Sequence, residues 1–127
     1  MTQDKELLLK DLCARLPYGV KLQKTYDTNE PVELYSINLD NNTVKFYKYK
    51  GESLTICDIG DIERFGKLRY KPYLFPLSSM NEEQKIELTC IIDSDYAQID
   101  WYNKNHFDYR GLIPMSLAID ATGLNIY

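Results

Sequence analysis

The chain has 127 residues and a mass of 14.9 kDa, a size at which one domain with a buried core is the commonest arrangement. Hydrophobic residues make up 44% of it and charged residues 27%, and it carries 11 tyrosines, 4 phenylalanines and 1 tryptophan, which excludes a disordered composition. The net charge of −4 argues against general binding to duplex DNA, because such binding depends on neutralising phosphates. We therefore expect a single domain over residues 1–127.

Neither a membrane span nor a secretion signal is indicated. The longest mainly apolar run without a charged residue, residues 111–119, is much shorter than the roughly 20 residues that cross a bilayer. The leucines at positions 7–9 are followed at once by Lys10 and Asp11, so the apolar stretch of a signal peptide is missing. We expect a soluble, cytoplasmic protein with no membrane partner.

The three cysteines are Cys13, Cys57 and Cys90, an odd number at wide spacing and without a CxxC pair. A secreted disulfide framework and a zinc site both need other patterns. We expect buried free thiols, and no metal or other cofactor.

The N-terminal part predicts a helix followed by an antiparallel meander. Between residues 4 and 16, apolar positions recur every three or four residues, as on one face of a helix, and Pro17 and Gly19 end it. Those apolar positions are Leu8, Leu9, Leu12, Cys13 and Leu16. The segments 20–25, 32–39, 43–50 and 53–58 are typical of strands, with turn signals at 40–42 and 51–52, so we expect three or four antiparallel strands.

The second half is predicted to be more helical. Gly60, Gly66, Pro72 and Pro76 interrupt residues 59–78, which we expect to form a packed irregular segment. A capping-box spacing from residue 79 to residue 82 predicts a helix over residues 80–92, and a second short helix is expected over residues 97–105. The predicted fold is therefore α+β, with an N-terminal helix, the meander, and then two helices packed on one sheet face.

Three segments carry a resemblance. They read DLCARLPYGV at 11–20, PYLFPLSSM at 72–80 and IDWYNKNHFDYRGLI at 99–113. They resemble a family of short uncharacterised proteins encoded in gut-bacterial genomes and in their phages or mobile elements; the chain departs from that family's pattern at Phe75 and at residues 114–115. The resemblance implies a genomic setting and no activity, cofactor or site residue.

The third segment gathers aromatic and ionisable residues into a candidate interaction patch. Its members are Trp101, Tyr102, His106, Phe107, Tyr109 and Arg110. Aromatic side chains of this kind either close a core or form the hot spot of an interface, since both uses exploit large area with a polar edge. The sequence leaves both interpretations open.

His106 is the only histidine, and Asp108 and Arg110 lie close to it in sequence. An acid or base formed by His106 and Asp108 is one interpretation, although no nucleophile motif accompanies it. The alternative is that His106 caps the preceding helix and Asp108 pairs with Arg110. We assign no catalytic residue.

A different set of residues supports binding to single-stranded nucleic acid. Its members are Lys45, Tyr47, Lys48, Tyr49, Arg69 and Tyr73, mostly from the region 40–71, which carries a net charge of +2. Aromatic side chains can stack on bases, and cations can bind phosphates. The alternative interpretation is that lysines on an edge strand prevent edge-to-edge aggregation.

The leading hypothesis is a small cytoplasmic, non-enzymatic accessory or interaction protein of a phage or mobile element, with a protein as its partner. A single-stranded nucleic-acid-binding module is the alternative, and an enzyme using His106 and Asp108 is the third possibility. The oligomeric state and the identity of the partner do not follow from the sequence.

Overall fold

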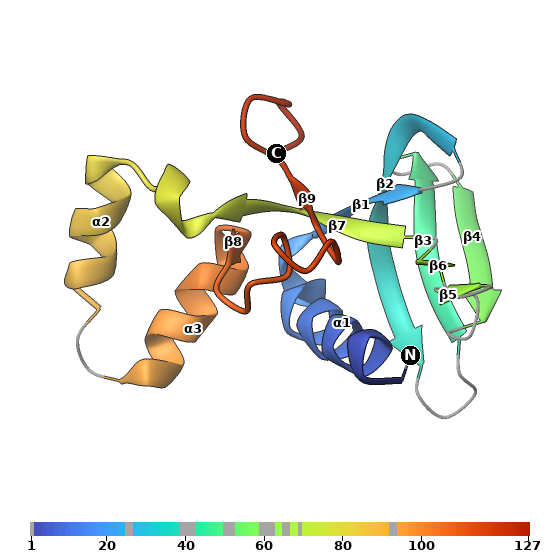
Figure 1. The fold of residues 1–127 in the computed structure, drawn as a ribbon, viewed down its shortest axis with the longest axis horizontal. Coiled ribbons are helices and arrows are strands. Elements are labelled where there is room, and N and C mark those ends of the chain that lie inside the picture. The colour runs from blue at the N-terminus through green and yellow to red at the C-terminus, as the bar shows by residue number, and fades with distance from the viewer. Residues whose placement is uncertain are drawn as a thin grey trace.

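The structure is a computed structural model, and it describes residues 2–24, 27–38, 43–49, 53–58, 63–64, 67–68, 70–91 and 94–127. Its helices are α1 (Thr2–Arg15), α2 (Glu82–Thr89) and α3 (Asp95–Lys104). Its strands are β1 (Lys21–Lys24), β2 (Asp27–Asn38), β3 (Thr43–Tyr49), β4 (Ser53–Asp58), β5 (Glu63–Arg64), β6 (Lys67–Leu68), β7 (Tyr70–Pro76), β8 (Phe107–Asp108) and β9 (Ile119–Asp120) (Figure 1). The expected α+β class is confirmed.

The main sheet begins with the predicted meander. Strands β1 to β4 pair antiparallel with their neighbours in sequence, with Leu22 opposite Val32 and Leu34 opposite Phe46. The full strand order is β4-β3-β2-β1-β7-β8, and β9 also pairs with β7. The turns expected at 40–42 and 51–52 lie outside the described residues.

Residues 70–76 form strand β7, so the expectation of an irregular segment was wrong here. On one side β7 pairs antiparallel with β1, where Pro72 lies opposite Leu22. On its other side β7 pairs in parallel with β9, beginning at Tyr73, and with β8, beginning at Phe75. Pro72 therefore precedes the parallel pairing. The sheet is therefore mixed, which corrects the predicted purely antiparallel arrangement.

Helix α1 covers the sheet and supplies part of the core. Leu8 and Leu12 are fully buried, and they pack in one cluster with side chains of β1, β2 and β7. The helix ends as predicted: a short 3-10 helix (Leu16–Tyr18) contains Pro17, and Gly19 takes a left-handed backbone with φ of +68°. Leu22, Leu34 and Leu74 belong to the same buried cluster, and the apolar area it removes from water stabilises the fold.

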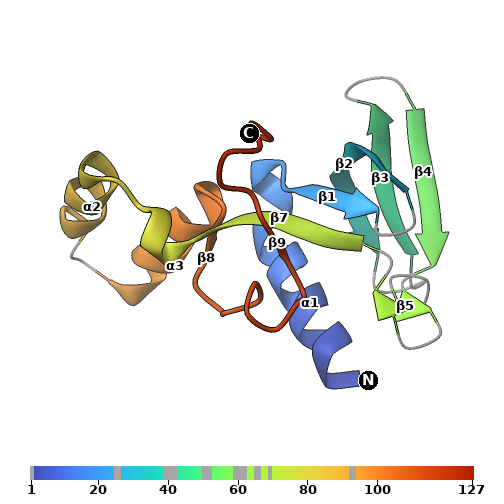
Figure 2. The same ribbon diagram turned by 45° about the horizontal axis from the view of Figure 1, so that its top comes forward.

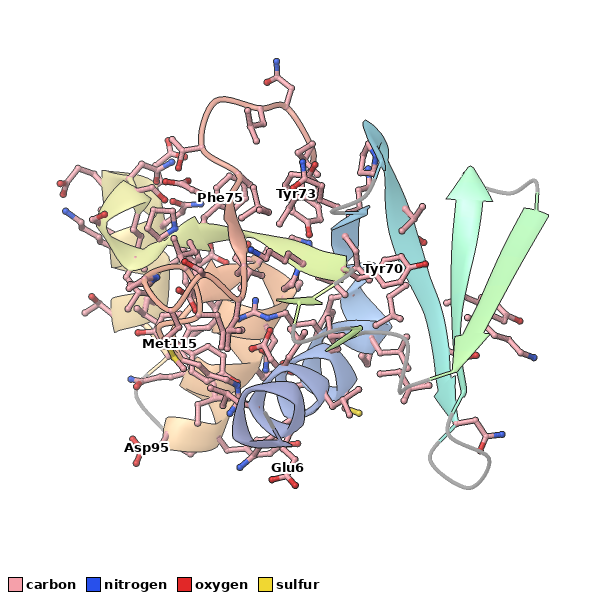
Figure 3. The ribbon with its side chains drawn as sticks, turned by 45° about the vertical axis from the view of Figure 1, so that its right-hand side comes forward. Glu6, Tyr70, Tyr73, Phe75, Asp95 and Met115 are labelled. Atoms are coloured by element: carbon pink, nitrogen blue, oxygen red, sulfur yellow. The ribbon has the colours of Figure 1, made fainter. Side chains whose placement is uncertain are left out.

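The two later helices occur in the predicted order with shifted ends. Helix α2 is capped by Asn81 and Gln84, whose side chains each accept from the other's backbone N–H at 2.8 and 2.9 Å, in place of the expected cap at residues 79 and 82. Ser94 caps α3 by accepting from the N–H of Ala97. Figure 3 shows Asp95 on the outside of α3, pointing away from the body of the molecule.

The expected packing of both helices on one sheet face is also corrected. In Figures 1 and 2, α2 and α3 lie beyond the β7 and β8 end of the sheet, away from β2, β3 and β4. Helix α3 contacts α1 and β8. The meander and the two later helices are thus joined by β7 and α1.

Cys13 and Cys90 are free, as expected, but exposed, which corrects the predicted burial. Cys13 was placed on the apolar face of α1, whereas the face that α1 buries includes Asp11 and Arg15 instead. The side chain of Cys57 lies outside the described residues. Within the described ranges, none of the helices has the length and apolar content needed to cross a membrane.

Candidate functional site

A buried charge network holds α1 against the chain that follows α3. Asp11 and Arg15 lie one turn apart on α1, and the Arg15 Nε donates to Asp11 Oδ2 at 2.8 Å. Arg110 Nε donates to the other oxygen, Asp11 Oδ1, at 3.1 Å, and an Arg15 Nη2 hydrogen bond reaches the carbonyl of Phe107. The side chains of Asp11 and Arg15 are fully buried. One carboxylate therefore serves two guanidinium groups.

Asp108 shapes the turn that carries Arg110. Its two carboxylate oxygens accept from the backbone N–H groups of Leu112 at 2.8 Å and Ile113 at 2.9 Å. Gly111, within this turn, has a φ of +76°, a conformation that glycine adopts without strain. The expected pair between Asp108 and Arg110 was wrong, since Arg110 pairs with Asp11.

His106 is buried and stacked. Its ring lies on the ring of Tyr127 with centroids 3.7 Å apart and planes 10° from parallel, and its Nδ1 finds no hydrogen-bond partner among the described residues. Burial, together with the positive charges of Arg15 and Lys21, lowers the pKa of His106 to about 4. The imidazole is therefore neutral near physiological pH.

The contacts around His106 differ from those that its predicted roles need. Its side chain does not cap α3; the amide of Asn105 does so by donating to the carbonyl of Trp101 at 2.9 Å. Both oxygens of Asp108 are bound to backbone N–H groups, and no hydrogen bond joins them to the His106 ring in the described part of the chain. The structure thus shows no assembled acid–base pair at these two residues.

Half of the predicted interaction patch is buried: Trp101, His106 and Phe107. Trp101 and Phe107 are 5% and 1% exposed, and their rings stack with centroids 5.5 Å apart. The Trp101 Nε1 donates to Glu87 of α2 at 3.0 Å, which ties the two helices together. Tyr102 and Tyr109 are half-buried and stack on each other. The core interpretation therefore holds for Trp101 and Phe107.

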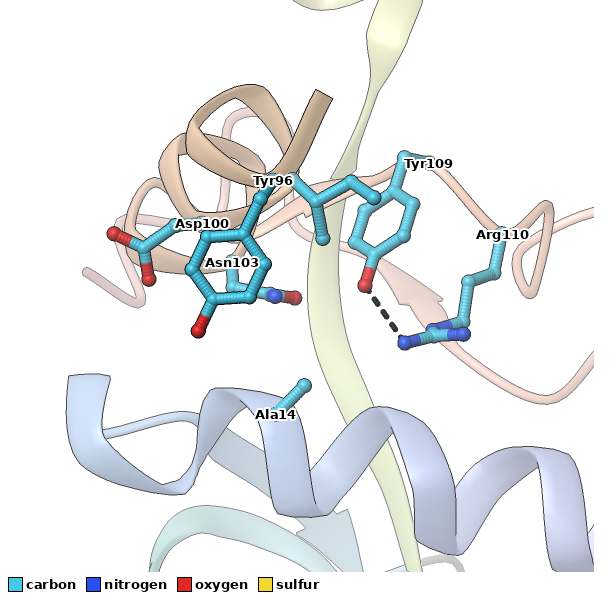
Figure 4. Close-up of a pocket in the computed structure, with 7 residues that line it drawn as sticks. Ala14, Tyr96, Asp100, Asn103, Tyr109 and Arg110 are labelled. Carbon is cyan, nitrogen blue, oxygen red and sulfur yellow. Dashed lines mark hydrogen bonds between the residues drawn. The ribbon is translucent and has the colours of Figure 1, made fainter. Parts of the chain in front are cut away.

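A pocket of about 210 Å³ opens between α1 and α3 (Figure 4). Its lining residues are Ala14, Tyr96, Ile99, Asp100, Asn103, Tyr109 and Arg110. Tyr96 is 83% exposed and Ile99 42%, so these two side chains form an exposed edge of the pocket.

Two groups in the pocket have unusual surroundings. Asn103 is only 5% exposed, yet its Oδ1 has no hydrogen-bond partner within the described ranges, and Figure 4 shows its amide directed into the space between Tyr96 and Tyr109. Arg110 lies at the other side, with Nη2 donating to the Tyr109 hydroxyl at 2.7 Å. Asp100 on α3 accepts a hydrogen bond from Tyr18, the last residue of the 3-10 helix that follows α1. This bond links α3 to the end of the N-terminal helical segment.

Of the lining residues, Tyr109 and Arg110 were predicted from the sequence and the others were not. Tyr96, Ile99 and Asn103 are spaced three and four residues apart on α3, which places them on one helical face. That spacing was a usable signal. No pattern in the sequence indicates that Ala14 and Arg110 would meet this face.

The residues of the nucleic-acid alternative are only partly described. Tyr73 is buried at 6% exposure, and its carbonyl accepts from the Tyr127 hydroxyl at 2.8 Å, so its ring is no open platform for a base. Lys45 is half-buried. The side chains of the other four, Tyr47, Lys48, Tyr49 and Arg69, lie outside the described residues. This alternative stays a prediction.

Comparison of the chain with protein-family models, with curated proteins and with solved structures found no match. Among the described residues, no three metal-ligating side chains of His, Cys, Asp or Glu are grouped as a metal site would need. The site is therefore interpreted from its own geometry.

Proposed function

We propose that this protein acts by binding another protein, and that it does so at the pocket between α1 and α3. In this proposal it is a small cytoplasmic accessory protein without catalytic activity. The cytoplasm and the setting in a phage or mobile element rest on the sequence alone, the latter on the resemblance of three segments.

The observation that carries the proposal is the exposure of Tyr96 beside Ile99 at the edge of the pocket. A tyrosine that is 83% exposed buries little area in the fold, so it adds little to the hydrophobic stabilisation of the domain. Aromatic side chains that flank a pocket are the residues that most often dominate the energy of protein interfaces. Ile99, 42% exposed on the same helical face, extends this surface.

Two contacts also link the elements that form the pocket. Asp11 on α1 pairs with Arg110 on the wall of the pocket, and Tyr18 after α1 bonds Asp100 on α3. These links fix α1, α3 and the turn after β8 relative to one another. A surface that is ordered before binding loses less conformational entropy when a partner docks.

Affinity capture with matched variants tests the proposal. Tagged wild-type protein is compared with the double variant Tyr96→Ser, Ile99→Ser and with Leu124→Ser, which alters a 50% exposed leucine in the C-terminal tail. We expect a defined partner that wild type and Leu124→Ser retain and the double variant loses, while all three show the same circular dichroism and unfolding transition.

Equal retention by all three proteins would contradict the proposal. So would a purified protein that stays alone in size-exclusion chromatography and pull-down but turns over a substrate.

A further inference from the structure

The first clue to what the pocket binds is the Asn103 amide. Buried side-chain oxygens are nearly always hydrogen-bonded, and leaving one unbonded is costly. Asn103 Oδ1 is buried without a partner in the described part of the chain, and the amide points into the pocket. A ligand that donates an N–H or O–H at this point would complete it.

The second clue is that two guanidinium groups share one carboxylate beside the opposite wall. Arg15 and Arg110 share the single carboxylate of Asp11, and Arg15 Nη1 has no partner among the described residues. Asp108 does not join them by a hydrogen bond, because both of its oxygens are occupied by backbone N–H groups. Arg110 therefore shares its one ion-pair partner with Arg15, and its guanidinium keeps N–H donors that could bind a second carboxylate.

Arg110 is where such a carboxylate can arrive. Its side chain is 19% exposed, whereas that of Arg15 is fully buried, and it lines the pocket. The acidic residue of the lining, Asp100, lies at the other end of the pocket from Arg110 in Figure 4 and is bonded to Tyr18. A guanidinium binds carboxylates through charge-assisted hydrogen bonds, which are roughly twice as strong as neutral ones.

The third clue is the size and character of the pocket. Drug-sized ligands occupy pockets of about 300–1,000 Å³. A volume of about 210 Å³, lined by Ala14, Tyr96 and Ile99 together with polar groups, has the size of a single residue with an apolar side chain.

We propose that the pocket binds the C-terminal residue of a partner protein. The terminal carboxylate lies against Arg110, the N–H of the last peptide bond donates to Asn103 Oδ1, and an apolar last side chain contacts Tyr96 and Ile99. A chain terminus carries these three groups within one residue, and capture of a C-terminal carboxylate is a recurring mode of peptide recognition. This inference rests on the proposed protein-binding function.

The test is an NMR titration of ¹⁵N-labelled full-length protein with three small probes. N-acetylglycyl-leucine carries a terminal carboxylate, N-acetylglycyl-leucinamide lacks it, and N-acetylglutamic acid α-amide offers only a side-chain carboxylate. We expect the first probe to shift the side-chain amide of Asn103 and the Nε–H of Arg110, with an affinity about tenfold or more above those of the other two.

Two variants supply matched controls. Arg110→Lys keeps a positive charge near Asp11 but loses the planar fork that matches a carboxylate, so it should reduce the preference for the free acid over the amide. Lys104→Gln removes an exposed positive charge at the end of α3, outside the pocket lining, and should leave that preference unchanged. The comparison among probes needs no variant, so a poorly folded Arg110→Lys does not weaken it.

Equal affinity for the acid and the amide would overturn the carboxylate assignment. Equal or tighter binding of the glutamate probe would overturn the C-terminal source and point to an internal acidic side chain. If no probe binds up to its solubility limit, the inference fails as a whole. None of these results decides the proposed function, which the Tyr96 and Ile99 capture experiment tests separately.

Discussion

Asp11→Asn is expected to be strongly destabilising, although it replaces only one carboxylate oxygen by an NH₂ group. Asp11 is fully buried and accepts from Arg15 at 2.8 Å and from Arg110 at 3.1 Å. The asparagine keeps the shape but removes the negative charge, so the fully buried guanidinium of Arg15 is left without a counter-charge. The neutral amide also presents an N–H₂ group where one of the two guanidinium groups needs an acceptor.

The size of the effect follows from the burial. Removing one partner of a buried ion pair typically costs about 3–5 kcal/mol. Small domains unfold with a total of about 5–15 kcal/mol, so Asp11→Asn should remove a large share of the stability. For a domain of this length each 1 kcal/mol corresponds to about 4 °C in Tm, so we expect Tm to fall by about 12–20 °C.

Urea and thermal unfolding, followed by circular dichroism, measure this loss. The matched control is Asp95→Asn, which makes the same chemical change at an exposed position in the first turn of α3 and should cost at most about 1 kcal/mol through the helix dipole. If Asp11→Asn and Asp95→Asn lose the same free energy of unfolding, the buried network does not hold α1 to the turn after β8.

Three further predictions concern the C-terminal part. Tyr127→Phe removes a hydroxyl that accepts from the Lys21 N–H of β1 and donates to the Tyr73 carbonyl of β7, both at 2.8 Å. The variant should lose about 1–3 kcal/mol of unfolding free energy in urea, whereas the control Leu124→Ala should lose at most about 0.5 kcal/mol. The pKa of His106 is lowered from 6.5 to about 4 in the folded protein, so the unfolded chain binds the proton more tightly. The stability that the neutral His106 contributes is therefore present above pH 6.5 and is lost as the pH falls towards 4. An NMR titration of this single histidine with a midpoint near 6.5 would contradict its burial. Gly111→Ala should cost about 1 kcal/mol from its φ of +76° alone, since an added Cβ has nothing within 4 Å, and Gly111→Asn should cost less in the same unfolding assay.

The elements with strong local signals were predictable. The leucine spacing of α1 and its end at Pro17 and Gly19 depend on neighbouring residues alone. The alternating strands of the meander were predicted in the right order, because antiparallel neighbours that follow one another in sequence need only short turns. For α2, two adjacent cap spacings compete, and the structure uses Asn81 with Gln84.

Strand β7 could not be predicted from its own residues. Pro72 and Pro76 are local breakers, and they favoured an irregular segment. The strand forms because its partners come from distant parts of the chain: β1 on one side, and Phe107 and Ile119 on the other. Such pairings depend on tertiary structure, which propensity does not contain.

The candidate site was predictable only in fragments. Nothing in the local sequence shows that Asp11 and Arg15 face inward from α1. Arg110 is 99 residues from Asp11 in sequence, and their contact creates both the buried network and one wall of the pocket. The helical spacing of Tyr96, Ile99 and Asn103 was visible, but which face of α3 would remain open was not.

Site-specific photo-crosslinking most directly tests whether the pocket between α1 and α3 is where this protein binds its partner. A benzophenone amino acid replaces Tyr96 in one full-length variant and Leu124 in another, and both are irradiated in the cells that carry the gene. We predict one discrete adduct from position 96, with the crosslinked peptide containing the last residue of the partner, and no such adduct from position 124. The same adducts from both positions, or none from position 96, would contradict a binding role for this pocket.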